Sequence, residues 1–204
     1  MRKLMTIAAL MLAVSVFAID AVSLNGKFNV KKSKGTVALF EGIDWSNTQV
    51  GSIDDGVFVK GSLPLLEYLQ KQDEQKIAEG KPEDANFVKD WDMEQQESDE
   101  MFKKCWNSEF KKGTQLTRNA ADAQYRLRVV INGLDFGSTA GSMFGWGRAG
   151  GAIATGVAEL SDINSGEVVA TFKLNHVQGS PSMTERLRLL ALMAQIVDEI
   201  EDVY

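Results

Sequence analysis

The most regular alternation of apolar and polar positions lies in the second half of the chain. Every second residue is apolar in three stretches, residues 125–131, 152–158 and 168–174, and the middle stretch uses small residues, Ala152, Ala154, Gly156 and Ala158. A period of two is typical of strands that bury one face. The segment Asp162–Gly166 separates the last two stretches and has the composition of a hairpin turn. The pattern therefore predicts three strands of an antiparallel sheet.

The first third of the chain carries weaker strand signals. Residues 27–31 alternate between apolar and polar side chains, and residues 35–42 are apolar on both faces, as in a central strand. Residues 44–56 are rich in turn-forming residues, which indicates a loop.

Three segments have the periodicity of helices. Residues 62–80 form the first, with Ser62 as the predicted cap, and residues 98–113 form the second, capped by Ser98 and extended backward to residue 87. Residues 182–204 form the third, where Ser182 and Glu185 have capping-box spacing. The broad apolar face of the third helix favours packing on a sheet, and a partner helix is the alternative.

The order of elements is strands, helices, three strands and a helix. This order predicts an α+β fold in which a mainly antiparallel sheet of about five strands has helices packed on one face. The length of residues 19–204 suits a single domain.

Residues 1–18 have the layout of a secretory signal peptide. Arg2 and Lys3 precede an uncharged run from Leu4 to Ala18, which is shorter than the roughly 20 apolar residues of a membrane span. Removing this segment leaves 20 Lys and Arg against 28 Asp and Glu, a net charge of −8. We therefore expect an exported protein with no transmembrane span in the mature chain. Its negative charge argues against nucleic-acid binding.

The segment from Gly141 to Gly151 is the most distinctive motif. It contains G-x-G-x-x-G, but a strand-like pattern follows the glycines where a dinucleotide site needs a helix. It is also too short and too polar for a membrane zipper. Two interpretations remain open, a glycine-rich connection between strands and an exposed loop that contacts a partner.

Catalytic chemistry has few suitable residues. His176 is the only histidine and Cys105 the only cysteine, so a histidine-rich metal site is excluded. We expect both side chains to be partly buried and to have structural roles. Carboxylates are plentiful, and those of residues 90–100 are best interpreted as a solvated helix face. We expect no enzyme activity, no cofactor and no metal. The alternative is a hydrolase or a glycan-binding protein that uses surface carboxylates.

The second half of the chain resembles an uncharacterised bacterial cell-envelope family. The strand of residues 125–131, the glycine-alanine strand, the hairpin positions Leu160, Asp162 and Gly166, and the terminal helix carry the resemblance, over residues 121–204. This family is similar to the CsgG, LpoB and TolB amino-terminal modules. The resemblance implies an α/β sandwich that acts in the envelope as a binding or assembly part, and it supplies no catalytic residues.

These observations predict a non-catalytic module that binds or helps assemble another envelope component. We expect it in the periplasm or at the outer-membrane periphery of a Gram-negative bacterium. Its partner is an envelope protein, another envelope component or a second copy of the chain, and a self-assembling structural subunit that uses the terminal helix is a further alternative. The predicted contact residues are exposed-looking apolar and charged side chains, namely Met143, Phe144, Trp146 and Arg148, with Trp45 and Asp44 in second place.

Overall fold

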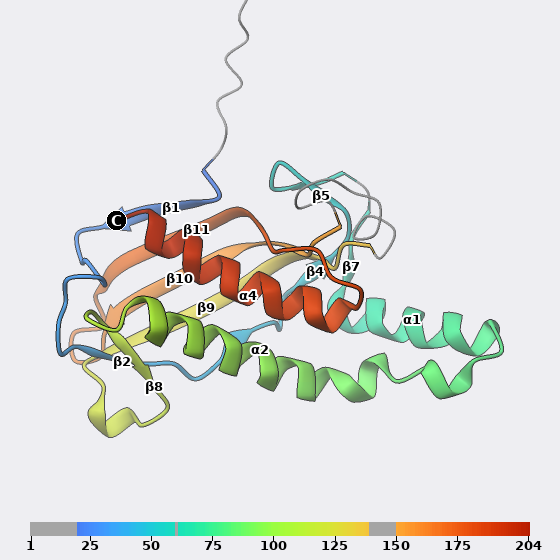
Figure 1. Cartoon of the computed structure of the whole chain (residues 1–204), viewed down its shortest axis with the longest axis horizontal. Coiled ribbons are helices and arrows are strands. Elements are labelled where there is room, and N and C mark those ends of the chain that lie inside the picture. The colour runs from blue at the N-terminus through green and yellow to red at the C-terminus, as the bar shows by residue number, and fades with distance from the viewer. Residues whose placement is uncertain (1–19, 60, 139–149) are drawn as a thin grey trace, which may run out of the picture.

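The computed structural model describes residues 20–59, 61–138 and 150–204 (Figure 1). The predicted signal peptide and four predicted contact residues, Met143, Phe144, Trp146 and Arg148, lie outside the described residues. In the part of the chain that is described, no helix has the length and apolar character needed to cross a membrane.

A mixed sheet of nine strands forms one layer of the fold. Its main path runs β1-β11-β10-β9-β2-β8, and the first four strands are antiparallel while β2 and β8 run parallel to β9. The strands of this path are β1 (Val22–Gly26), β2 (Val37–Leu39), β8 (Gln115–Thr117), β9 (Tyr125–Asp135), β10 (Ile153–Asp162) and β11 (Val168–Gln178).

The strand beside β9 is broken into three pieces. After β2, the short strands β3 (Ile43–Asp44) and β4 (Gln49–Val50) continue along β9 in the same direction, and β7 (Leu63–Pro64) pairs with β4 on its other side. A small separate hairpin, β5 (Ile53–Asp54) and β6 (Val57–Phe58), packs near Gly133 of β9.

Helices α2 and α4 lie on one face of the sheet, and α1 extends beyond its β4–β7 end (Figure 1). Helix α4 (Glu185–Asp202) packs on β11 and on α2 (Phe87–Glu109), and α1 (Leu65–Ala78) runs beside the first half of α2. Short 3₁₀ turns at Pro82–Asp84 and Ala120–Asp122 complete the connections. The apolar stripe of α4 therefore has a sheet and a partner helix within the same chain.

The core lies between the sheet and α2 and α4. Trp106 is fully buried there, and its ring stacks on Phe102 with centroids 5.9 Å apart and lies tilted against Phe110 with centroids 4.6 Å apart. Its indole N–H donates to the Thr114 carbonyl at 2.9 Å. Ala154 and Ala158 of β10 are also fully buried, as the small-residue pattern predicted. These small side chains allow the helical layer to pack close to the sheet.

The predicted α+β class is confirmed, while several details were wrong. The sheet has nine strands where about five were predicted, and the strand predicted at residues 27–31 lies instead at 22–26. The loop predicted at 44–56 contains the two-residue strands β4 and β5 and the second residue of β3. β3 and β4 are set by long-range pairing with β9 and β7, and β5 by its hairpin with β6. Strands of two residues are too short to show an alternation in the sequence.

The predicted helix caps were also wrong. Helix α1 begins after Pro64 with no side-chain cap, and Ser98 lies inside the continuous helix α2, where its hydroxyl donates to the Glu94 carbonyl. Helix α4 is capped by Thr184, which accepts from the Leu187 N–H at 3.2 Å, two residues after the predicted Ser182. Several serines and threonines near a helix start satisfy the cap pattern equally well, and the local chain path decides among them.

Candidate functional site

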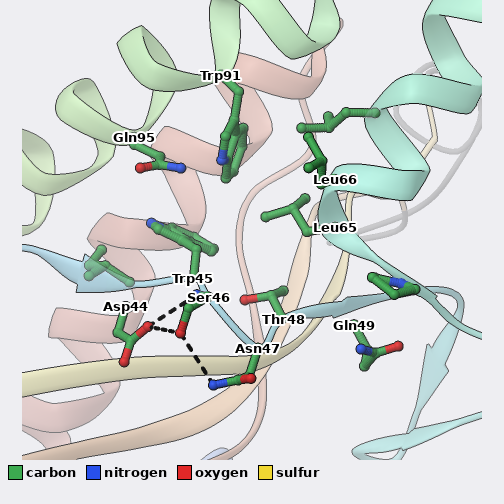
Figure 2. Close-up of a pocket in the computed structure, with 13 residues that line it drawn as sticks. Asp44, Trp45, Ser46, Asn47, Thr48, Gln49, Leu65, Leu66, Trp91 and Gln95 are labelled. Carbon is green, nitrogen blue, oxygen red and sulfur yellow. Dashed lines mark hydrogen bonds between the residues drawn. The ribbon is translucent and has the colours of Figure 1, made fainter.

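A groove of about 730 Å³ opens where the broken strand meets α1 and α2 (Figure 2). We call it the Trp45 groove. Its lining comes from three places in the sequence, namely the β3–β4 segment at residues 43–49, the start of α1 (Pro64, Leu65, Leu66 and Leu69), and Trp91 and Gln95 of α2. Its volume is within the range of ordinary ligand-binding pockets.

The break in the strand creates the groove. Asp44 accepts hydrogen bonds from the backbone N–H of Ser46, at 3.1 Å, and from its hydroxyl, at 2.6 Å, so the chain turns sharply after β3. Thr48 then returns the chain to the sheet by donating its hydroxyl to the Ile131 carbonyl of β9 at 2.6 Å. The Leu65 N–H donates to the Thr48 carbonyl at 3.0 Å, which brings the start of α1 against the same turn.

The groove also lies at a gap in the edge of the sheet. On the side away from β9, strand β8 covers β2 and strand β7 covers β4. Among the described residues, no strand pairs with residues 43–48 on that side. The Ile43 N–H is instead bound by the Asp99 side chain of α2 at 2.8 Å. A turn at residues 45–48, closed by the Thr48 N–H donating to the Trp45 carbonyl at 3.0 Å, therefore lies between the two covered ends.

Two tryptophans form the apolar floor. Trp45 is 6% exposed and Trp91 is 7% exposed, and their rings meet edge to face with centroids 5.5 Å apart. Leu66 stands at the rim and is 57% exposed. Ile43, Leu65 and Leu69 are buried as well. The exposed part of the lining therefore combines two apolar residues, Pro64 and Leu66, with two polar ones, Ser46 and Asn47.

Three neutral polar groups at the groove lack partners. The indole nitrogen of Trp45 is buried and makes no hydrogen bond to any described residue. The side-chain amides of Gln49 and Gln95 line the groove and likewise bond to no other residue that the structure describes. Figure 2 shows Gln95 and Trp91 on the α2 side of the groove, facing Trp45. Only the Trp45 indole nitrogen is buried, and a buried polar group without a partner costs about 1–3 kcal/mol, so it favours an incoming hydrogen-bond acceptor. Gln49 and Gln95 are only partly buried.

The one charge in the lining is compensated. The pKa of Asp44 lies below its usual range because the Ser46 hydroxyl and N–H bind the carboxylate, and Arg128 contributes from 3.1 Å. Asp44 is therefore an ionised turn-former with an ion-pair partner. It lacks the raised pKa of a general acid, and the groove as a whole is electrically neutral.

Of the six predicted contact residues, Asp44 and Trp45 line the groove together. Three further lining residues were not predicted from the sequence, namely Trp91, Leu66 and Gln95. Trp91 belongs to the acidic stretch that was interpreted as a solvated face, and the apolar spacing from Phe87 to Trp91 was the signal for a buried helix side.

The histidine and the cysteine lie away from the groove and have structural environments. His176 accepts a hydrogen bond from the Gly56 N–H at its Nδ1, at 3.1 Å. Cys105 is partly buried against the core, its Sγ lies 3.7 Å from the sulfur of Met101, and burial raises the pKa of its thiol. Both residues fit the predicted partly buried roles.

The acidic stretch of α2 was only partly interpreted correctly. Asp92 is exposed, but Glu94 is partly buried, and that burial together with the negative charge of Glu185 raises its pKa to about 7. Burial also raises the pKa of Glu185, although the nearby positive charge of Arg188 acts in the opposite direction. Neither glutamate lines the Trp45 groove. Within the described ranges, no group of three His, Cys, Asp or Glu side chains is placed to hold a metal ion.

Comparisons with known proteins add a likeness of structure only. No family model matches the chain, and no curated protein matches it. Among solved structures, the chain is similar to the PelC dodecamer from Paraburkholderia phytofirmans, with a TM-score of 0.42 and 11% identity over 87% of this chain and 96% of that one. A variant of the same dodecamer gives a TM-score of 0.41 and 10% identity over 88% and 95%. At these TM-scores we base nothing further on the likeness.

Proposed function

We propose that this protein is a non-catalytic binding module of the bacterial cell envelope, and that the Trp45 groove is where it binds another envelope component. Export to the periplasm or the outer-membrane periphery is part of the proposal, and it rests on the signal-peptide pattern of residues 1–18. The resemblance to envelope binding and assembly modules supports the same role. No activity on a substrate is included.

One observation carries the binding role. The Trp45 groove combines an exposed apolar rim at Leu66 with the buried Trp45 indole N–H, which has no partner among the described residues, and with neutral polar side chains. Grooves of this composition bind ligands by shape and by a few hydrogen bonds. The nearest carboxylate, Asp44, is held ionised by Ser46 and Arg128, which favours a binding role over acid–base chemistry at this place.

Photo-cross-linking in cells tests this proposal. Leu66 at the groove rim is 57% exposed and Ile77, near the other end of the same helix, is 59% exposed, so the two positions are matched except for the groove. We would place p-benzoylphenylalanine at each position in the full-length protein and irradiate intact cells. Position 66 should form a discrete cross-link that position 77 does not form, and the captured component should bind the purified wild-type protein.

Equal cross-linking from the two positions would contradict a specific role for the groove. The export part of the proposal is tested separately by fractionation. The protein should appear in the periplasmic or outer-membrane fraction without residues 1–18, and a full-length cytoplasmic protein would contradict it.

A further inference from the structure

We propose that His176 is a pH-sensitive latch: its neutral ring holds the β5–β6 hairpin against β11, and protonation of the ring releases the hairpin. The inference goes beyond the binding role of the Trp45 groove and does not depend on it. Three observations carry it, namely the atom of His176 that accepts the hydrogen bond, the few other bonds that hold the hairpin, and the surface that the hairpin covers.

The hydrogen bond at the tip of the hairpin exists only while the imidazole is neutral. The Gly56 N–H donates to Nδ1 of His176 at 3.1 Å, so this nitrogen carries a lone pair and the ring proton is on Nε2. In the protonated ring both nitrogens are donors, and an N–H on Nδ1 would face the N–H of Gly56. Because histidine changes charge between pH 5 and 8, mild acid removes this bond.

The tip of the hairpin is seated closely on β11. Asp55 and Gly56 have positive φ angles of 45° and 77°, as a two-residue type I′ loop requires. A Cβ on Gly56 would lie 2.4 Å from the carbonyl oxygen of Asn175, so the backbones are already in contact. The tip therefore has no room to move toward β11, and two facing donors separate only when the tip or the ring moves away.

Few other bonds hold the hairpin in place. Its strands pair only with each other, over two residues each. Within the described ranges, one other hydrogen bond joins residues 53–58 to the rest of the fold, from the Ile53 N–H to the Asp135 carboxylate at 3.3 Å. Val57 is 67% exposed and adds little packing. The bond to His176 is therefore a large part of the polar attachment of the hairpin.

Release of the hairpin uncovers part of the sheet. Ile53 is 5% exposed and packs, together with Phe58, over Gly133 of β9. Along the chain the hairpin joins β4 to β7, and these two strands carry Gln49 and Pro64 of the Trp45 groove. The latch therefore acts on the segment that connects two parts of the groove lining.

The charged groups around His176 do not replace the lost acceptor. On the elements packed around it they are Asp54 and Asp55 of the hairpin, Lys173 of β11, Asp135 of β9 and Asp20 before β1. Among the residues that the structure describes, none of them forms an ion pair with His176. An attraction between Asp55 and the protonated ring would still leave the Gly56 N–H without an acceptor.

Amide hydrogen exchange of the purified protein, followed by NMR at pH 7.5 and pH 5, tests the latch. The protection factor compares the observed exchange rate of an amide with its intrinsic rate at the same pH. For the Gly56 N–H it should fall at least about fivefold at pH 5, the effect of one lost hydrogen bond. The Asn175 N–H, which donates to the Ala21 carbonyl at 2.9 Å on the same stretch of β11, is the internal reference and should keep its protection.

Two substitutions separate the latch from a general effect of acid. Asparagine offers a carboxamide oxygen near the position of Nδ1 and does not titrate, whereas phenylalanine keeps a ring and has no acceptor. In both His176→Asn and His176→Phe, the protection of Gly56 should therefore be the same at the two pH values. In His176→Phe it should already be low at pH 7.5.

Three results would each overturn the inference. The first is equal protection of Gly56 in the wild type at both pH values. The second is a loss of protection at pH 5 in His176→Asn as large as that in the wild type. The third is wild-type protection of Gly56 in His176→Phe at pH 7.5, which would show that the bond to the imidazole does not hold the hairpin.

Discussion

Arg188 provides the most demanding test of how the helical layer is held to the sheet. It is the largest buried charged side chain among the described residues, with 2% of its surface exposed. Its guanidinium donates from Nε to the Phe136 carbonyl at 2.6 Å and from Nη1 to the Ser182 carbonyl at 2.9 Å. The first bond connects α4 to the residue that follows β9, and the second holds the segment just before α4 against the helix. Glu185 supplies a nearby negative charge.

Replacing Arg188 with Met keeps the apolar stem and removes the charge and its donors. Each hydrogen bond from a charged group contributes about 1.5–3 kcal/mol, and removing one partner of a buried charge pair costs about 3–5 kcal/mol. The two estimates agree, so we expect Arg188→Met to lower the free energy of unfolding by about 4 kcal/mol. At about 2–4 °C per kcal/mol, the melting temperature should fall by roughly 8–16 °C.

Urea denaturation at pH 7 measures this effect, with m-values compared to confirm that the unfolding transition is the same. Arg126→Met is the matched control, because Arg126 is exposed and its ion pair with Glu41 spans 3.5 Å at the surface. The control should change stability by less than about 1 kcal/mol. If Arg188→Met destabilises the protein no more than the control does, the buried guanidinium does not hold α4 to the sheet, and this reasoning is wrong.

Three further predictions concern titration, packing and thiol reactivity. Because the pKa of Glu94 is about 7 in the folded protein against an ordinary 4.5, its ionisation destabilises the fold progressively above pH 4.5. In urea titrations at pH 7.5, Glu94→Gln should therefore be more stable than wild type by about 1 kcal/mol, a value that allows for solvent screening. At pH 4 the two proteins should be equally stable. Equal stability at both pH values would contradict the raised pKa of Glu94. A Cβ on Gly179 would lie 2.6 Å from a backbone nitrogen of α4, so Gly179→Ala should cost about 1–3 kcal/mol. Gly61→Ala, where a Cβ would meet no atom within 4 Å, should change stability by less than about 0.5 kcal/mol when both variants are measured by differential scanning calorimetry, and similar losses in both variants would refute the close approach. Burial raises the pKa of Cys105, so iodoacetamide at pH 8 should modify the folded protein more slowly than the urea-unfolded chain, and equal rates would show that the thiol is accessible.

The long elements could be predicted because their patterns repeat over many residues. Strands β9, β10 and β11 and helices α1, α2 and α4 all lie where the period of the apolar positions placed them. The short strands β3, β4 and β7 could not be predicted in the same way. Each is two residues long and exists because β9 and the start of α1 hold the chain there.

The Trp45 groove was only partly visible in the sequence. Asp44 and Trp45 stood out because a large aromatic residue follows an acidic one in a turn-rich segment. Trp91 is 46 positions away and was hidden among acidic residues, and only the tertiary fold brings it to 5.5 Å from Trp45. The partnerless amides of Gln49 and Gln95 also follow from tertiary structure, since a sequence does not show which side chains lack a hydrogen bond.

The central claim is that the Trp45 groove binds a partner, and an affinity measurement with one rim substitution tests it most directly. Leu66→Asp places a charge at the groove rim, and Ile77→Asp places the same charge on an equally exposed position of α1 outside the groove. We predict that the component captured at position 66 binds Leu66→Asp at least 30-fold more weakly than wild type, about 2 kcal/mol by the relation of affinity to free energy, with an unchanged melting temperature. Ile77→Asp should bind like wild type. Equal affinities for wild type, Leu66→Asp and Ile77→Asp would contradict the claim.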